Sequence, residues 1–68
     1  MKNLYIGERI VVFDYYAPGT HEYGTIHDMS DDLKSVTCFL ENETLFYGDL
    51  KTQGIVWDIA EDEEQYET

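Results

Sequence analysis

The run Ile10, Val11, Val12 and Phe13 constrains the fold of this chain more than any other feature of its sequence. β-Branched and aromatic residues favour strands, and an unbroken run of them is typical of a strand that is covered on both faces. Because side chains alternate along a strand, successive members of the run are expected on opposite faces. Such a strand suits a small barrel better than an open sheet. The sequence therefore predicts a strand over residues 8–14, with which the rest of the chain must pair.

Four later segments also have strand character, and turn-forming residues separate them. Strands are expected over 21–28, 35–41, 44–48 and 55–59, and a single 3-10 turn is expected over 49–54. In the segment 35–41, Val36, Cys38 and Leu40 alternate with polar residues, and Phe39 is the one apolar residue on the outer side. The last strand is expected to place Ile55, Trp57 and Ile59 on one face.

The connections carry residues with special backbone preferences. Pro18 and Gly19 at the centre of the turn after the first strand predict a type II turn. Gly24 interrupts the second strand and permits a bulge or a sharp bend. Asn42 lies in the short loop 41–43 and can take the positive φ that a hairpin of this length requires.

With 68 residues the chain is expected to form one domain, over 1–60, followed by an acidic C-terminal tail over 61–68. From Asp58 to Thr68, six of eleven residues are acidic and none is basic, so a solvated tail is expected. An acidic helix over 57–66 is the alternative, but Ile55 and Val56 favour a strand first. A domain of this size buries only about 60% of its unfolded surface, so its function should lie on its surface.

The order of these elements resembles the SH3-like small-barrel superfamily, including its KOW and Tudor-type members. Three stretches carry the resemblance: Gly7 to Val12, Tyr23 to Ile26, and Asp49 to Lys51 ahead of Gly54 to Trp57. The resemblance implies an all-β fold, a five-stranded SH3-like barrel with a one-turn 3-10 helix before the last strand. It brings no proline-binding signature with it.

The chain has neither the apolar core of a signal peptide nor an apolar run long enough for a membrane span. Cys38 is the only cysteine, and its place in an alternating apolar run predicts a small buried hydrophobe in a reducing compartment. A soluble protein of the bacterial cytoplasm is therefore expected.

Sites for metal ions and catalysis are not indicated by the sequence. Asp28, Ser30 and Asp32 imitate the start of a calcium loop, but Leu33 and Phe39 occupy the positions that need glycine and glutamate.

A zinc site is not indicated either, because His21 and His27 lack further ligands. Cys38 points inward in this interpretation, away from either histidine, and a small barrel offers no cleft for acid and base chemistry. A protein without enzymatic activity, metal or cofactor is expected.

Fifteen Asp and Glu stand against four Lys and Arg, for a net charge of −11. A globule of this length is about 28 Å across, and B-DNA of that length carries about 16 phosphate charges. Eleven negative charges reach about two thirds of that density. Such a surface repels nucleic acid and anionic membranes, and it attracts basic protein surfaces.

The leading hypothesis is an acidic protein that blocks a nucleic-acid site on a host defence or DNA-processing protein. In size and charge the chain resembles phage-encoded anti-restriction and anti-CRISPR inhibitors. The carboxylates expected to form one acidic face are Asp28, Asp31, Asp32, Glu41, Glu43 and Asp49, extended by Glu61, Asp62, Glu63 and Glu64 of the tail. Tyr15, Tyr16 and Tyr23 are expected to add aromatic contacts. The plain alternative is that the acidity only keeps the protein in solution.

Two other binding hypotheses remain open. In the first, an aromatic cage lined by acids binds a cationic peptide, as in Tudor-type barrels. Its aromatic members would be Tyr15, Tyr16, Tyr23, Tyr47 and Trp57, with Asp14, Asp49 and Asp58 nearby. In the second, a small structural subunit forms a homo-oligomer through an apolar patch around Phe39, Phe46 or Trp57.

Overall fold

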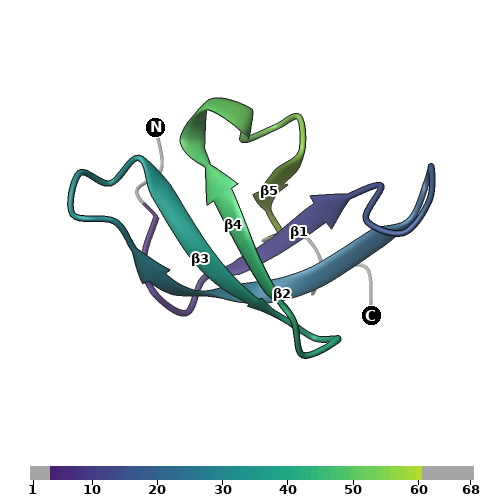
Figure 1. The fold of residues 1–68 in the computed structure, drawn as a ribbon, viewed down its shortest axis with the longest axis horizontal. Coiled ribbons are helices and arrows are strands. Elements are labelled where there is room, and N and C mark those ends of the chain that lie inside the picture. The colour runs from purple at the N-terminus through teal and green to yellow at the C-terminus, as the bar shows by residue number, and fades with distance from the viewer. Residues whose placement is uncertain (1–3, 61–68) are drawn as a thin grey trace.

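A computed structural model, which describes residues 4–60, shows a single antiparallel sheet of five strands curled into a half-barrel (Figure 1). The elements are β1 (Arg9–Phe13), β2 (His21–Met29), β3 (Ser35–Leu40), β4 (Leu45–Asp49), the 3-10 helix η1 (Leu50–Thr52) and β5 (Trp57–Ile59). The strand order β4-β3-β2-β1-β5 leaves β4 and β5 at the two ends of the sheet. The all-β prediction with five strands and one 3-10 turn is confirmed, and the predicted tail over 61–68 lies outside the described residues.

The core lies on the concave side of the curled sheet and follows the predicted alternation. Its buried members come from four strands: Ile10 and Val12 of β1, Ile26 of β2, Val36, Cys38 and Leu40 of β3, and Trp57 of β5. Val11 is also buried although it points to the other face, so β1 has buried side chains on both of its faces as predicted. Because most of the apolar side chains of β1 and β3 are buried in contact with other side chains, little apolar surface remains to line an internal cavity.

β2 contains an irregularity, but not at the predicted position. Its pairing with β3 is regular around Gly24 and shifts register between Ile26 and Asp28. The extra residue, His27, reverses the alternation, so that Met29 rather than Asp28 packs against the core. Gly24 was expected to permit a bulge or a sharp bend, but the bulge lies at His27, because the change of register there buries a methionine in place of an aspartate.

The turn between β1 and β2 has the predicted geometry. Thr20 donates its backbone N–H to the carbonyl of Ala17 over 3.0 Å, and Gly19 has a φ of +85°. Both features are those of a type II turn with proline and glycine at its centre. The Asp14 carboxylate also accepts the Gly19 N–H at 2.7 Å, which ties the two ends of this connection together.

The connection between β3 and β4 has four residues, 41–44, and in it Glu43, and not Asn42, takes the positive φ, of 71°. Glu43 donates its N–H to the Leu40 carbonyl at 2.9 Å, the pattern of a turn followed by one left-handed residue. The Asn42 side chain has another task, because its carbonyl oxygen accepts the Thr44 hydroxyl at 2.5 Å. The prediction for Asn42 was therefore off by one residue.

Replacing Glu43 with glycine is expected to raise the free energy of unfolding by about 0.5–1 kcal/mol. The left-handed conformation costs an L-residue about 1–2 kcal/mol, and glycine removes this cost. Glycine also raises the conformational entropy of the unfolded chain, which offsets about 0.4–1 kcal/mol of the gain. Urea unfolding measures the difference. Glu43→Gln keeps the strained backbone but removes the charge, so equal stabilisation in both variants would trace the effect to charge repulsion instead.

The last strand is shorter than predicted, because it begins at Trp57 and not at Ile55. Ile55 and Val56 both donate their N–H groups to the Thr52 carbonyl, at 3.0 and 2.9 Å, and therefore belong to a turn. Ile55 is 73% exposed, so the prediction that it shares the buried face of Trp57 was wrong. A glycine with a φ of +88°, Gly54, lets the chain turn at this point.

Candidate functional site on the outer face of the sheet

The outer face is the side of the sheet that points away from the core. One row of side chains crosses four strands there, because Arg9 pairs with Thr25, Thr25 with Phe39, and Phe39 with Leu45. These pairs lie on neighbouring antiparallel strands, so their side chains stand close enough to touch. The row begins with a charged residue on β1 and ends with an apolar residue on β4.

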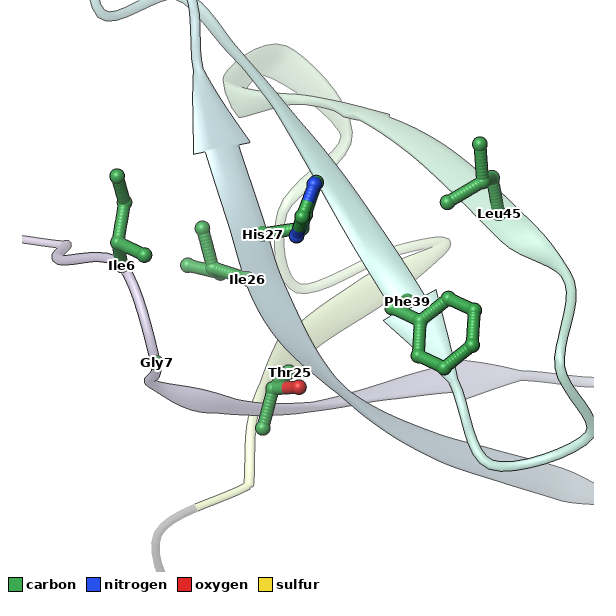
Figure 2. A pocket seen from close by; sticks show the side chains of 7 residues that line it. All are labelled: Ile6, Gly7, Thr25, Ile26, His27, Phe39 and Leu45. Carbon is green, nitrogen blue, oxygen red and sulfur yellow. The ribbon is translucent and has the colours of Figure 1, made fainter.

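The apolar end of this row opens into a shallow groove of about 540 Å³. Figure 2 shows that its lining runs from the segment before β1 across β2 and β3 to β4. The lining residues are Ile6, Gly7, Thr25, Ile26, His27, Phe39 and Leu45. Phe39 and Leu45 are each 49% exposed. We call this surface the apolar groove.

Tyr47, the next outward residue of β4, is 70% exposed and extends the apolar surface beyond Leu45. Contiguous exposed apolar side chains of this kind mark interaction sites more often than scattered ones do. Of the patch that the homo-oligomer hypothesis requires, only Phe39 is exposed, because Trp57 is buried and Phe46 packs against the core.

The predicted acidic residues fall into two groups at opposite ends of the sheet. Asp28 is the next-to-last residue of β2, Asp31 and Asp32 lie in the following turn, and Asp49 pairs with Ser35 at the start of β3, so these four share one end. Lys34 and Lys51 belong to the same end, where the Leu50 N–H is bonded to the Lys34 carbonyl at 3.0 Å. This first group therefore includes cations as well as carboxylates.

Glu41 and Glu43 lie in the β3–β4 loop at the other end. The Glu41 carboxylate accepts a hydrogen bond from the Arg9 guanidinium at 2.8 Å, and the two side chains form an ion pair. The described residues thus do not bring the predicted carboxylates together in one cluster, but place them at the two opposite ends of the strands. Glu61, Asp62, Glu63 and Glu64 lie outside the described residues.

Asp32 organises the turn between β2 and β3. Its carboxylate accepts the Ser30 hydroxyl at 2.6 Å and the Lys34 N–H at 3.1 Å. The hydrogen bond from Ser30 and the backbone bond from Lys34 lower the pKa of Asp32, because both stabilise its charged form.

The charged form of Asp32 is expected to stabilise the fold above the ordinary pKa of 3.8, and this stabilisation is expected to be lost as the pH falls through the lowered value. Asp32→Asn keeps a hydrogen-bond acceptor but cannot titrate, so the unfolding curves of parent and variant should converge below pH 3.8. Asp31→Asn matches the change in net charge. An equal loss of stability in Asp32→Asn and Asp31→Asn would contradict a specific role for the Asp32 hydrogen bonds.

The tyrosines of the β1–β2 connection pack against the β3–β4 loop. The rings of Tyr15 and Tyr16 are 4.8 Å apart and nearly perpendicular. The Tyr15 hydroxyl is 3.1 Å from the Thr44 hydroxyl, and the Asn42 amide donates to the Tyr16 hydroxyl at 2.5 Å. Tyr15 packs against the core while Tyr16 stays exposed, so one ring holds the other in position.

The other aromatic residues of the cage hypothesis lie elsewhere. Tyr23 is on β2 beneath the Arg9 guanidinium, 5.8 Å from it. Trp57 is fully buried, and Tyr47 points outward from β4. The structure therefore assembles only Tyr15 and Tyr16, and not a cage of all five residues.

The histidines and the cysteine are also separated. His21 packs edge-on against Phe13, His27 lines the apolar groove, and Cys38 is buried in the core. Burial raises the pKa of the Cys38 thiol to about 11. Within residues 4–60, no three His, Cys, Asp or Glu side chains come close enough together to hold a metal ion.

Two features of this region were not predicted from the sequence. Glu8 is buried, with 1% of its surface exposed, and alternation backward from Ile10 and Val12 would have placed it on the core side. The apolar groove depends on the pairing of Phe39 with Leu45, and the short β3–β4 loop was the available signal for that register.

Among residues 4–60, no helix has the length and apolar character that a bilayer crossing requires. The chain matches no protein-family model, and neither the curated proteins nor the solved structures contain a significant match to it.

Proposed function

We propose that this chain is a non-catalytic binding protein that covers a basic, nucleic-acid-binding surface of a partner protein. The observation that carries the proposal is the charge, −11 over 68 residues. Carboxylates lie at both ends of the strands that line an exposed apolar groove, on a body of 33 × 25 × 22 Å. Apolar centres with a charged rim are the usual anatomy of a protein interface.

Electrostatics supports a basic partner in particular. The described residues contain ten Asp and Glu against three Lys and Arg. A field of this sign attracts a lysine- or arginine-rich surface over long distances and speeds its association. A partner that binds nucleic acid presents such a surface, and occupation of that surface by this chain would exclude nucleic acid from it.

Affinity capture from a bacterial lysate on the immobilised chain tests the proposal. Captured proteins should be displaced by duplex DNA but not by an equal mass of uncharged dextran. The affinity of a purified captured protein should fall by about tenfold or more between about 50 and 200 mM salt, because each ion pair lost weakens binding. Displacement by neither polymer, together with an affinity that is insensitive to salt, would contradict the proposal.

A second candidate function rests on the exposed Tyr16 ring, which Tyr15 and Asn42 hold in place. An aromatic face held in this way suits a cationic side chain through cation–π attraction. If this ring is the main contact, Tyr16→Ala abolishes binding while the salt dependence stays shallow. Tyr16→Phe keeps the ring and serves as the matched control, since it removes only the bond from Asn42.

A further inference from the structure

We infer that β4 is a docking edge, at which a basic partner adds an extended segment as a new strand of the sheet. The outer side chains of that segment would pack against Leu45 and Tyr47, at the open end of the apolar groove. The basic character of the partner rests on the proposed function, whereas the edge itself rests on the geometry that follows.

The backbone of β4 has free hydrogen-bonding capacity on one side. β4 ends the sheet, and the Leu40 N–H donates to the Thr44 carbonyl at 2.8 Å. Because antiparallel strands alternate in which residues face the partner strand, Phe46 and Gly48 also direct their backbone groups toward β3. Leu45 and Tyr47 therefore direct theirs away from β3. Among residues 4–60, no backbone bond from beyond the β3–β4 pair reaches them.

The opposite end of the sheet differs, because the edge of β5 is already used. Gln53 forms a bridge with Trp57, and Gly54 donates its N–H to the Trp57 carbonyl at 2.6 Å. The side chain of Gln53 also donates to the Asp58 carboxylate at 3.1 Å. Of the two ends of the described sheet, β4 is thus the one that can accept another strand.

β4 also lacks the features by which proteins usually protect an edge strand. Leu45 to Gly48 contains no lysine, no proline and no other charged residue, and the register with β3 is regular throughout. The side chains of Leu45 and Tyr47 are exposed on the outer face. Main-chain pairing together with alternate side-chain contacts is the arrangement by which sheet edges bind extended peptides.

Charge selects the occupant of this edge. Glu43 lies in the loop before β4 and Asp49 ends the strand, so carboxylates stand at both ends of the open edge, which is about 17 Å long for five extended residues. A segment with lysine or arginine near each end and apolar residues between them complements this pattern. A second copy of the chain does not, because it would bring a net charge of −11 against another of −11.

Selection from a phage-displayed library of random 12-residue peptides, against the full chain, tests the inference. Enriched peptides should alternate apolar residues and carry lysine or arginine toward both ends. Addition of a synthetic enriched peptide should slow hydrogen exchange at the Leu45 and Tyr47 amides at least tenfold. Methylation of alternate peptide nitrogens on the side that faces β4 should abolish binding.

Leu45→Pro should weaken the same peptide at least tenfold, because it removes an outward N–H at the first residue of the strand, where proline is tolerated. Leu45→Val keeps this N–H and should bind within twofold of the parent. The exchange measurement is made on the parent chain, so it decides the question even if Leu45→Pro does not fold.

Four results would overturn the inference: no enrichment, equal binding by folded Leu45→Pro and Leu45→Val, unchanged exchange at both amides, or protection of these amides by self-association without peptide. Failure of the proposed function looks different. In that case enriched peptides still protect the β4 amides, but duplex DNA does not displace the proteins captured from lysate.

Discussion

Replacing Trp57 with alanine is expected to destabilise the fold by about 3–5 kcal/mol, the usual cost of emptying a buried aromatic site. The Trp57 side chain is fully buried within the core cluster, and its indole N–H donates to the Asp49 carbonyl at 2.9 Å. The total stability of a small domain is of the same size as this loss. The variant should therefore be largely unfolded at 25 °C.

The effect is large because Trp57 connects the two ends of the sheet. Among the described strands β5 pairs with β1 alone, and the Trp57 ring reaches across to β4, where a Cβ on Gly48 would lie 3.0 Å from it. Without the ring, the half-barrel is open on this side and the core is exposed to water. The loss of a cavity-filling group and the loss of a contact between distant strands then act together.

Far-UV circular dichroism and urea unfolding measure the change, because the variant loses the only tryptophan of the chain. Trp57→Phe is the matched control, since it retains an aromatic ring but not the N–H donor. In the control the Asp49 carbonyl still accepts the Thr52 hydroxyl at 2.9 Å, so the lost indole N–H leaves no unpaired acceptor. The control should therefore lose about 1–2 kcal/mol less of the free energy of unfolding than the alanine variant does. Equal losses in both variants would show that the ring does not close the barrel.

Local patterns were enough to predict most of the strands. The alternation of Val36, Cys38 and Leu40 identified the core face of β3, and Pro18 with Gly19 identified the turn type. In these segments the same residues that favour the local conformation also bury the side chains, so local and tertiary preferences agree.

The errors lie where tertiary contacts decide between local alternatives. Ile55 has strand propensity, but its N–H is bonded to Thr52 in a turn, and strand propensity depends on the context of the residue. The bulge at His27 depends on whether Met29 or Asp28 enters the core, and that choice requires the register with β3. Neither outcome is encoded in a short window of sequence.

The candidate site was harder to predict than the fold. In a sheet of consecutive antiparallel strands, successive loops lie at alternate ends, so the carboxylates of the β2–β3 turn and of the β3–β4 loop cannot share one loop cluster. This consequence follows from topology alone, and the sequence analysis did not take it into account. The apolar groove needed the cross-strand pairing of Phe39 with Leu45, which a linear pattern does not contain.

Gly24→Ala is expected to cost about 3 kcal/mol, at the upper end of the range for overpacking. Gly24 lies in the centre of β2, where it pairs with Ile10 on one side and with Leu40 on the other. A Cβ at this position would lie 2.5 Å from the Phe39 carbonyl oxygen and 2.8 Å from the Leu40 Cα. Both are backbone atoms, which cannot move aside as a side chain can, so β2 and β3 would have to separate.

The matched control is Gly54→Ala, which introduces the same methyl group at a site with nothing within 4 Å but with a φ of +88°. This variant carries only backbone strain and should lose about 1–2 kcal/mol. Urea unfolding compares the two losses, and amide chemical shifts of Phe39 and Leu45 should move in Gly24→Ala alone, because the separation of β2 from β3 reaches the apolar groove. If Gly24→Ala costs no more than Gly54→Ala and leaves these shifts unchanged, the two strands do not approach each other as closely as the structure has them. The groove would then lack the rigid support on which a specific binding surface depends.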